Sequence, residues 1–149
     1  MDLDAIRSRL QPTTTNWGDG SSAPGSVQLR ESEALMQMKQ PRKSSLNSAA
    51  MAFDPRHMDA AWELVNCLER RRDPDAEPVF PYALKQAWFR EHPDEAFFLY
   101  VVRRDPERFE TRSAMSKYDV YFCDQEGEVF SALNDFSVLD RPRLSQVRL

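Results

Sequence analysis

Glycine, cysteine and histidine are all scarce in this 149-residue chain, which has four, two and two of them. With so few glycines, a loop that cradles phosphate through close backbone approach is not expected. The two cysteines, Cys67 and Cys123, form neither a disulfide framework nor a zinc-ligand pattern. The motifs GxSxG, HExxH and CxxC are also absent. We therefore expect no cofactor and no metal.

Long apolar runs are missing as well. The longest, Ala96 to Val102, is far too short to cross a bilayer. The first ten residues, MDLDAIRSRL, are charged and lack the apolar centre of a signal peptide. The sequence therefore predicts a cytoplasmic protein without membrane association.

Charge is divided unevenly along the chain. Residues 1–57 carry seven basic and six acidic side chains, whereas residues 58–149 carry thirteen and eighteen, within a total of −4. A compact unit of net negative charge repels a phosphate backbone unless its cations gather on one face. Nucleic-acid binding by the second part of the chain is therefore disfavoured.

The first fifty residues are polar, and most of the aromatic residues follow them. Residues 11–50 are rich in Ser, Thr, Gln, Asn, Pro and Gly, and they bury too little apolar surface to offset their ordering entropy. Two short segments, 2–10 and 31–40, have the residue pattern of helices that form on docking. We therefore predict a flexible or partner-docked arm over 1–51 and a compact domain over 52–149.

The second part of the chain has two helix patterns followed by three strand patterns. Asp54-Pro55 is typical of a helix start, and the arginines up to Arg72 suit its C-terminus. A second helix is predicted over 81–91. Apolar runs predict three strands, at 96–102, 118–123 and 129–133. Residues 124–127 are predicted to form a tight turn between the last two strands, with Gly127 in the left-handed position. The expected fold is α+β, with two helices packed on one face of a small antiparallel β-meander behind an extended arm.

One thiol, one imidazole and one carboxylate form the only candidate catalytic set: Cys123, His92 and Asp119. Each has a simple structural interpretation, and the structural interpretation is favoured. Arg103, Arg104, Arg108 and Arg112 could grip a phosphate or a carboxylate, but the acidic residues among them favour local ion pairs.

Two further charged stretches also have plain explanations. Asp73, Asp75 and Glu77 alternate as at the start of a calcium loop, but the glycine and the last acid of such a loop are missing. The basic segment 41–45 is interpreted as a solubilising linker rather than as a binding patch.

The functional prediction rests on apolar side chains that lie outside the one stripe that each helix can bury against a sheet. On the first helix a second face holds Ala60, Leu64 and Cys67, which either more of the same chain or a partner must cover. We predict a non-catalytic interaction or assembly protein that docks on another protein or a larger assembly; a homo-oligomer is compatible with this. The predicted partner-binding residues are Leu3, Ile6, Leu10, Leu35, Met36, Met38, Tyr82 and Phe89.

Two alternatives stay open. The first is a small regulator or inhibitor whose acidic domain mimics nucleic acid and covers a basic enzyme surface. The second is a small enzyme that uses the Cys123, His92 and Asp119 set or the arginine-rich loop. A concave pocket with these three groups within hydrogen-bonding reach would favour the enzyme.

Overall fold

The computed structural model describes residues 1–13, 26–39, 55–75, 77–90, 96–104 and 115–140. Its elements follow the chain as α1 (Leu3–Arg9), β1 (Gln11–Thr13), β2 (Ser26–Leu29), β3 (Glu33–Lys39), α2 (Pro55–Arg72), β4 (Val79–Phe89), β5 (Ala96–Arg103), β6 (Met115–Cys123) and β7 (Val129–Asp140).

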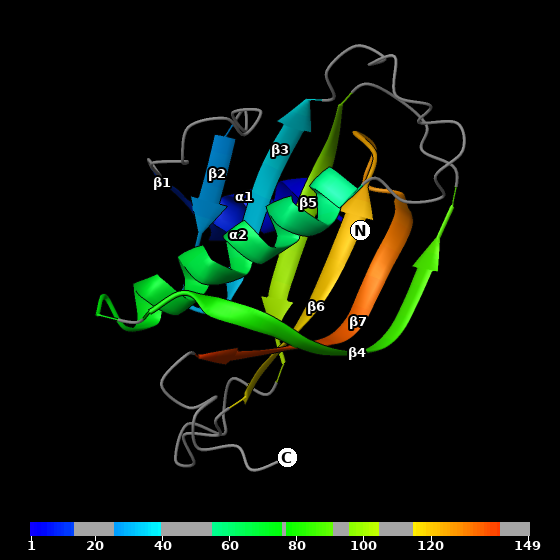
Figure 1. Cartoon of the computed structure of the whole chain (residues 1–149). Helices are drawn as coiled ribbons and strands as arrows, with labels where there is room; N and C mark the ends of the chain where they lie inside the picture. Colours follow the sequence, from blue (N-terminus) through cyan, green and yellow to red (C-terminus); the bar gives the residue numbers. More distant parts are fainter. Residues whose placement is uncertain (14–25, 40–54, 76, 91–95, 105–114, 141–149) are drawn as a thin grey trace.

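The seven strands form one antiparallel sheet in the order β1-β2-β3-β5-β6-β7-β4 (Figure 1). The three strands of the predicted meander, β5, β6 and β7, are neighbours in its middle. The predicted antiparallel meander of three strands is therefore confirmed, but it is only the middle of a sheet of seven strands. Strands from the first forty residues extend it on one side, and β4 forms its other edge.

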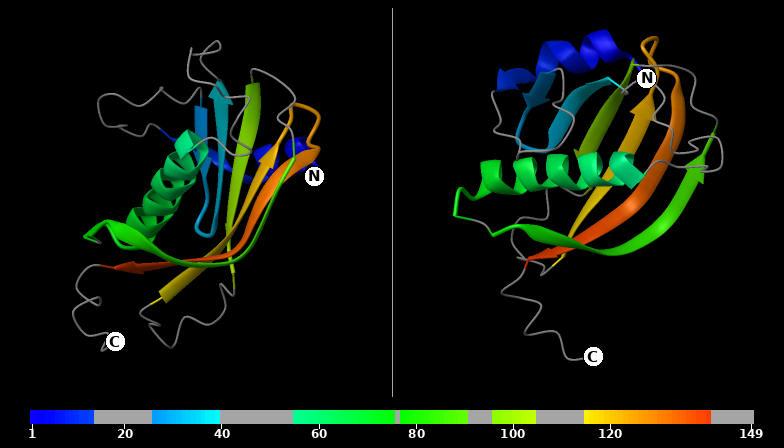
Figure 2. Two further views of the ribbon diagram at one scale, coloured as in Figure 1. Left: turned by 45° about the vertical axis from the view of Figure 1, so that its right-hand side comes forward. Right: turned by 45° about the horizontal axis from the view of Figure 1, so that its top comes forward.

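Helix α2 lies across the sheet, whose strands curve around it (Figures 1 and 2). The predicted helix from Pro55 to Arg72 is confirmed. Its buried side chains come from both predicted stripes, because the curved sheet covers more of the helix than a flat one would. Leu64 and Cys67 are buried and Ala60 packs against the core, so the chain itself covers the second face.

Helix α1 packs on the opposite face of the sheet (Figure 2). The carboxylate of Asp2 caps it by accepting the Ala5 N–H at 3.1 Å, as an N-cap residue does. Its apolar side chains, with Leu10 just beyond, join a second buried cluster that also holds Leu35, Phe98, Tyr100 and Cys123. The helix predicted within 2–10 is therefore confirmed. The two helices expected on one face of the meander were those at 55–72 and 81–91, and only the first of them is a helix.

The helix predicted at 31–40 is wrong, because this segment forms β3. Alternate residues Ala34, Met36 and Met38 face the core around α2, whereas Leu35 faces the cluster under α1. Glu, Ala, Leu and Met favour helices when considered alone. Pairing with β5 along all seven residues of β3, and with β2 on the other side, outweighs that local preference.

The helix predicted at 81–91 is also wrong, because β4 runs through Val79–Phe89 and pairs with β7. The apolar residues that suggested a helical stripe do not form a buried face: Leu84 is 39% exposed. Pro81 fits an edge strand, because proline has no N–H to donate and the outer side of an edge strand has no neighbouring strand to receive that hydrogen bond. The register shifts beside it, between Pro81 and Ala83.

The turn after β6 follows the prediction. Gly127 has a φ of +91°, and its N–H donates to the Asp124 carbonyl at 3.1 Å. Strand β7 then continues to Asp140, well beyond the predicted strand end. It contains a bulge at Asp135, whose φ is 56° and whose N–H donates to the Asp119 carboxylate at 3.0 Å.

The predicted boundary between arm and domain, at 51/52, lies outside the described residues. On either side of that gap, the described residues belong to the same sheet. Val27, Leu29 and Met36 from the first segment share one buried cluster with Leu64 and Phe122 from the second.

Candidate functional site

His57 lies in the first turn of α2 and is only 6% exposed. Its ring centroid is 4.7 Å from that of Phe97 and 5.6 Å from that of Phe122, and the second pair is stacked. Phe130 packs edge-on against Phe97 at 5.8 Å. Strands β5 and β6 therefore place phenylalanine rings against the imidazole at the start of the central helix, and Phe130 from β7 packs against both of these rings.

A hydrogen-bond network fixes the middle of α2 to the start of β4. The Asn66 side-chain oxygen accepts the Val79 N–H at 2.8 Å, and its amide nitrogen donates to the Trp62 carbonyl at 3.2 Å. The Trp62 indole N–H donates to the Val79 carbonyl at 2.5 Å. Because both backbone groups of Val79 are bound to α2, the position of β4 depends on the helix.

A polar cluster closes the C-terminal end of α2. The Tyr118 hydroxyl donates to the Glu69 carboxylate at 2.5 Å, and the Arg103 guanidinium lies 3.8 Å from the same oxygen. Arg103 also donates to the Ser116 hydroxyl at 3.0 Å. Burial, followed by the charge of Glu69, raises the pKa of Tyr118 well above its ordinary value. The phenol is therefore a neutral donor, and the cluster joins α2 to β5 and β6.

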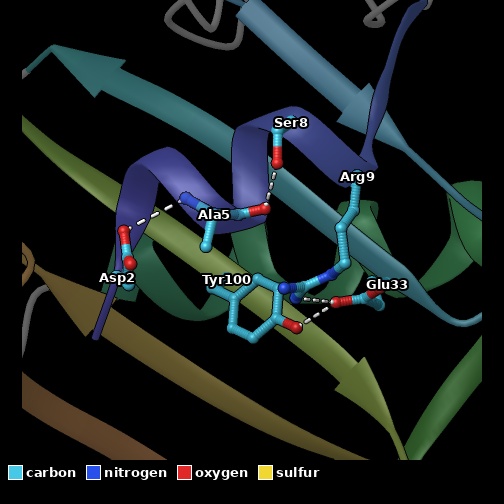
Figure 3. Close-up of polar contacts among 6 residues, drawn as sticks. All are labelled: Asp2, Ala5, Ser8, Arg9, Glu33 and Tyr100. Carbon is cyan, nitrogen blue, oxygen red and sulfur yellow. Dashed lines mark hydrogen bonds and ion pairs between the residues drawn. The ribbon is translucent and has the colours of Figure 1, made fainter.

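A second polar cluster lies under α1 (Figure 3). The Glu33 carboxylate accepts from the Tyr100 hydroxyl and from the Arg9 guanidinium, the latter at 2.7 Å. Burial, the largest effect, raises the pKa of Glu33, but its hydrogen bonds to Arg9 and Tyr100 outweigh it, so that the net pKa is lowered. Burial and the bond to Glu33 raise the pKa of Tyr100. This cluster attaches the end of α1 to β3 and β5.

The structure does not assemble the predicted catalytic set. Cys123 is fully buried next to Met1, and burial raises its pKa to about 11, so the thiol is not activated. Asp119 is four residues away on the same strand, roughly 13 Å at the usual strand rise. Its carboxylate is held by Arg104 at 3.3 Å and by the Asp135 N–H. His92 lies outside the described residues.

The predicted partner-binding residues fall into two groups. Tyr82 and Phe89 lie on the edge strand β4 and are 50% and 39% exposed. The other six are buried within the chain itself, where they pack against its own sheet: Leu3, Ile6, Leu10, Leu35, Met36 and Met38.

Two of the four arginines around the predicted arginine-rich loop lie in the described residues, and both are paired within the fold. Arg103 and Arg104 bind Glu69 and Asp119 from other elements rather than the acidic residues next to them in sequence. Arg108, Arg112 and the basic segment 41–45 lie outside the described residues. Among the described residues no group of acidic, histidine and cysteine side chains could hold a metal ion, and no helix could span a membrane.

One long helix enclosed by a curved antiparallel sheet is a hotdog-like fold. The family model for the polyketide synthase dehydratase N-terminal domain matches residues 23–140. The chain therefore belongs to the polyketide synthase dehydratase N-terminal domain family.

Solved structures agree with this assignment. The pyran synthase domain from module nine of the sorangicin pathway has a TM-score of 0.72 at 19% identity, with 94% of this chain and 55% of that one covered. The dehydratase domain from the CurJ module of the curacin polyketide synthase has a TM-score of 0.74 at 19% identity, with 93% of this chain and 53% of that one covered. A trans-acyltransferase polyketide synthase enoyl-isomerase has a TM-score of 0.72 at 11% identity, with 92% of this chain and 54% of that one covered. An inactive histidine-to-phenylalanine mutant of the CurJ dehydratase is also similar.

The chain spans about half the length of the solved structures that it matches. No curated protein matches its sequence. Two of the similar structures are domains from modules of larger systems, which fits the predicted association with a larger assembly at the level of the family.

The family membership overturns the predicted function. A non-catalytic adaptor, assembly protein or regulator is wrong, because the matching family is that of polyketide synthase dehydratases and the similar structures include a pyran synthase domain and a dehydratase domain. The prediction assigned apolar residues of the first forty positions, together with Tyr82 and Phe89, to contact with a partner. The sheet of the chain itself covers most of those residues.

Sequence reasoning also missed His57. A signal was present, since His57, Ala61, Leu64 and Leu68 are spaced four, three and four residues apart, along one buried face of a helix. A histidine in such a stripe stands out among apolar neighbours. The search for a histidine close to Cys123 led to His92 instead.

Proposed function

We propose that the chain forms the N-terminal half of a dehydratase-type unit that removes water from a β-hydroxyacyl chain of a polyketide, held as a thioester on a carrier protein. The family match over residues 23–140 carries this proposal. The similarity to dehydratase, enoyl-isomerase and pyran synthase domains supports it.

The reaction class requires a group that moves protons. Elimination of water from a β-hydroxy thioester takes a proton from the carbon next to the carbonyl and delivers a proton to the departing hydroxyl. A histidine suits both steps near neutral pH. The inactive CurJ mutant has lost a histidine, and this chain has only two, His57 and His92.

His57 is the candidate that the described structure supports. It lies on the central helix, at the end where Phe97, Phe122 and Phe130 line its surroundings with apolar rings. Apolar walls suit an acyl chain and exclude water, which strengthens electrostatic interactions at the reacting atoms. In this proposal the acyl chain approaches His57 from the small part of its surface that stays exposed.

The test is the conversion of a β-hydroxyacyl thioester, on a carrier protein and as a small synthetic thioester, followed by mass spectrometry for the loss of one water. The wild-type chain should form the unsaturated product. His57→Phe should lower the rate at least a hundredfold, the lower range for a lost general acid–base group. Phenylalanine keeps an aromatic ring between Phe97 and Phe122, so packing is disturbed little.

Two controls separate chemistry from folding. His92→Phe tests the second histidine, and Cys123→Ala removes a buried thiol that the proposal does not use. Both should retain activity, and circular dichroism should show His57→Phe to be folded. No conversion by the wild-type chain, either alone or together with the second half of the unit, would overturn the proposed activity. Full activity of a folded His57→Phe variant would overturn the assignment of His57.

A further inference from the structure

We propose that residues 1–3 are a positioning element: by packing against Gly127, they hold the hairpin tip, residues 122–130 of β6, β7 and the turn between them, in place beside His57. The residue that allows this contact is Gly127. The inference rests on the proposed function only where that function assigns His57 to the active site. The contact and its effect on the surroundings of His57 can be measured without turnover.

Gly127 lies in close contact with the start of the chain. It is buried, and a Cβ atom built on it would lie 2.1 Å from the backbone oxygen of Met1. Real Cβ atoms do not come so close to another atom, and the obstacle is backbone rather than the movable end of a side chain. The same Cβ would lie 3.6 Å from Leu3 Cγ. Glycine is therefore needed here for the approach of residues 1–3 as well as for its φ of +91°.

Helix α1 holds residues 1–3 against the turn. Figure 2 shows α1 crossing the outer face of the sheet, with the N-terminus beside the hairpin of β6 and β7. The far end of α1 is attached to β3 and β5 by the polar cluster around Glu33 (Figure 3). Between the two ends, the Arg7 guanidinium lies 4.6 Å from the centroid of the Phe98 ring. A displacement of residues 1–3 is therefore resisted by a helix that is fixed to two other strands.

The turn is compact, so that it moves as a unit. The Asp124 carboxylate accepts the N–H groups of Glu126 and Glu128, both at 2.9 Å. The Asp124 N–H donates to the Glu128 carbonyl at 2.9 Å. These bonds connect the two ends of the turn, and a displacement at Gly127 is therefore passed to the strand residues on either side.

Strand pairing holds the hairpin tip less firmly than the rest of the hairpin. The register of β6 against β7 shifts between Phe122 and Cys123, and such a shift interrupts the ladder. Packing supplies the missing contact, since Cys123 is fully buried and its sulfur lies 4.0 Å from that of Met1. Successive strand residues point to opposite faces, so Cys123 faces α1 while Phe122 faces His57. Packing on the outer face thus fixes a residue whose neighbour contacts the imidazole on the inner face.

Two rings of the hairpin tip lie next to the candidate site. Phe122 stacks on His57 with the ring centroids 5.6 Å apart, and Phe130 packs against Phe122 at 6.4 Å. If the tip moves, the imidazole loses its stacked neighbour and part of its apolar surroundings. Residues 1–3 therefore act on His57 through the hairpin and not by contact with it.

The experiment compares two matched cavities in one buried cluster. Leu3 and Leu10 are 7% and 5% exposed, and both belong to the cluster under α1. Leu3 lies next to Gly127, whereas Leu10 is the C-cap residue at the other end of the helix. Leu3→Ala and Leu10→Ala therefore remove the same side chain from the same cluster, at opposite distances from the hairpin tip.

Nuclear magnetic resonance of the full chain, with carbon-13-labelled histidine, reports on the surroundings of His57. Neighbouring phenylalanine rings displace its ring-proton signals from those of histidine in an unfolded chain, and His92→Gln identifies the signals of the second histidine. Leu3→Ala should move the His57 signals toward the unfolded values and speed hydrogen exchange of the amides in the hairpin tip roughly tenfold or more. Leu10→Ala should lower the unfolding free energy by a similar amount and leave both readouts unchanged.

Gly127→Ala adds the obstructing Cβ and should produce the same shift of the His57 signals. Leu3→Ala keeps the test decisive if Gly127→Ala fails to fold. Unchanged His57 signals in a folded Leu3→Ala variant, or equal shifts in Leu3→Ala and Leu10→Ala, would overturn the proposal. A wild-type chain without turnover would count against the proposed function alone, because none of these readouts requires catalysis.

Discussion

Replacing Ile6 by alanine measures how firmly α1 is packed on the sheet. Ile6 lies in the middle of α1, is 5% exposed, and shares a buried cluster with Leu35, Phe98 and Tyr100. The substitution removes three carbon atoms, worth about 2.4 kcal/mol at roughly 0.8 kcal/mol each. Because this cluster is on the outer face of the sheet, where α1 can shift to close part of the cavity, the loss should stay near 2–3 kcal/mol.

Equilibrium unfolding in urea, followed by tryptophan fluorescence, gives the free energy of unfolding directly. The midpoint should fall by about 1 M while the slope stays constant. The thermal midpoint should fall by about 5–10 °C for a chain of this size. Ser8→Ala is the matched control, because Ser8 is exposed on the same helix and its hydroxyl donates to the Ala5 carbonyl of that helix. Its effect should stay within about 0.5 kcal/mol.

One result would refute this reasoning. If Ile6→Ala unfolds with the same free energy as Ser8→Ala, α1 contributes nothing to the packed core. Leu3, Ile6 and Leu10 would then be available to another molecule, as the sequence pattern alone had suggested.

Three other predictions follow from the buried polar groups. Cys67 and Cys123 should both resist thiol reagents in the native state at pH 8, because burial raises the pKa of each thiol. With a pKa of about 11, about one Cys123 thiol in a thousand is ionised at this pH. Rapid labelling of either thiol before denaturation would contradict this prediction. The lowered pKa of Glu33 stabilises the fold above its unfolded value of 4.5, and this contribution is lost as the pH falls through the folded value. The unfolding free energy of wild type should therefore fall between pH 7 and about pH 3.5 more than that of Glu33→Gln, and parallel curves would disprove the link. Asn66→Ala removes the acceptor of the Val79 N–H, so the unfolding free energy should fall by about 1–3 kcal/mol and hydrogen exchange of the Val79 amide should become faster. Unchanged protection of the Val79 amide would show that this hydrogen bond is not needed.

Periodicity in the sequence predicted the elements whose burial is simple. Helix α2 has a start signal, an apolar stripe and basic residues at its end, and all three agree. Strand β5 is a continuous apolar run, and Gly127 marks the turn after β6. At these places the local preference and the tertiary environment favour the same conformation.

Strands β3 and β4 could not be predicted in this way. Both contain residues that favour helices, and neither forms a strand because of its own composition alone. For β3 the deciding contribution is pairing with β2 and β5, and for β4 it is pairing with β7. Pairing partners distant in sequence leave no local signal.

The candidate site was hidden for a related reason. His57 becomes notable only when β5 and β6 bring Phe97 and Phe122 against it, with Phe130 from β7 packed on both rings. In the sequence these rings lie 40, 65 and 73 positions after the histidine. Asp119, by contrast, was selected for its chemistry, although the structure uses it to hold the bulge at Asp135.

The pairing of β3 with β5 sets a condition on how this polypeptide acquires its structure during synthesis. Met36 lies opposite Leu99, and the whole of α2 and β4 is made between them. A ribosome must therefore release residues beyond Arg103 before β3 can gain its inner neighbour. Closing so long a loop is slow compared with forming a helix. Until then the apolar side chains of β3 have only β2 beside them in the sheet, which makes the nascent chain a natural client for chaperones.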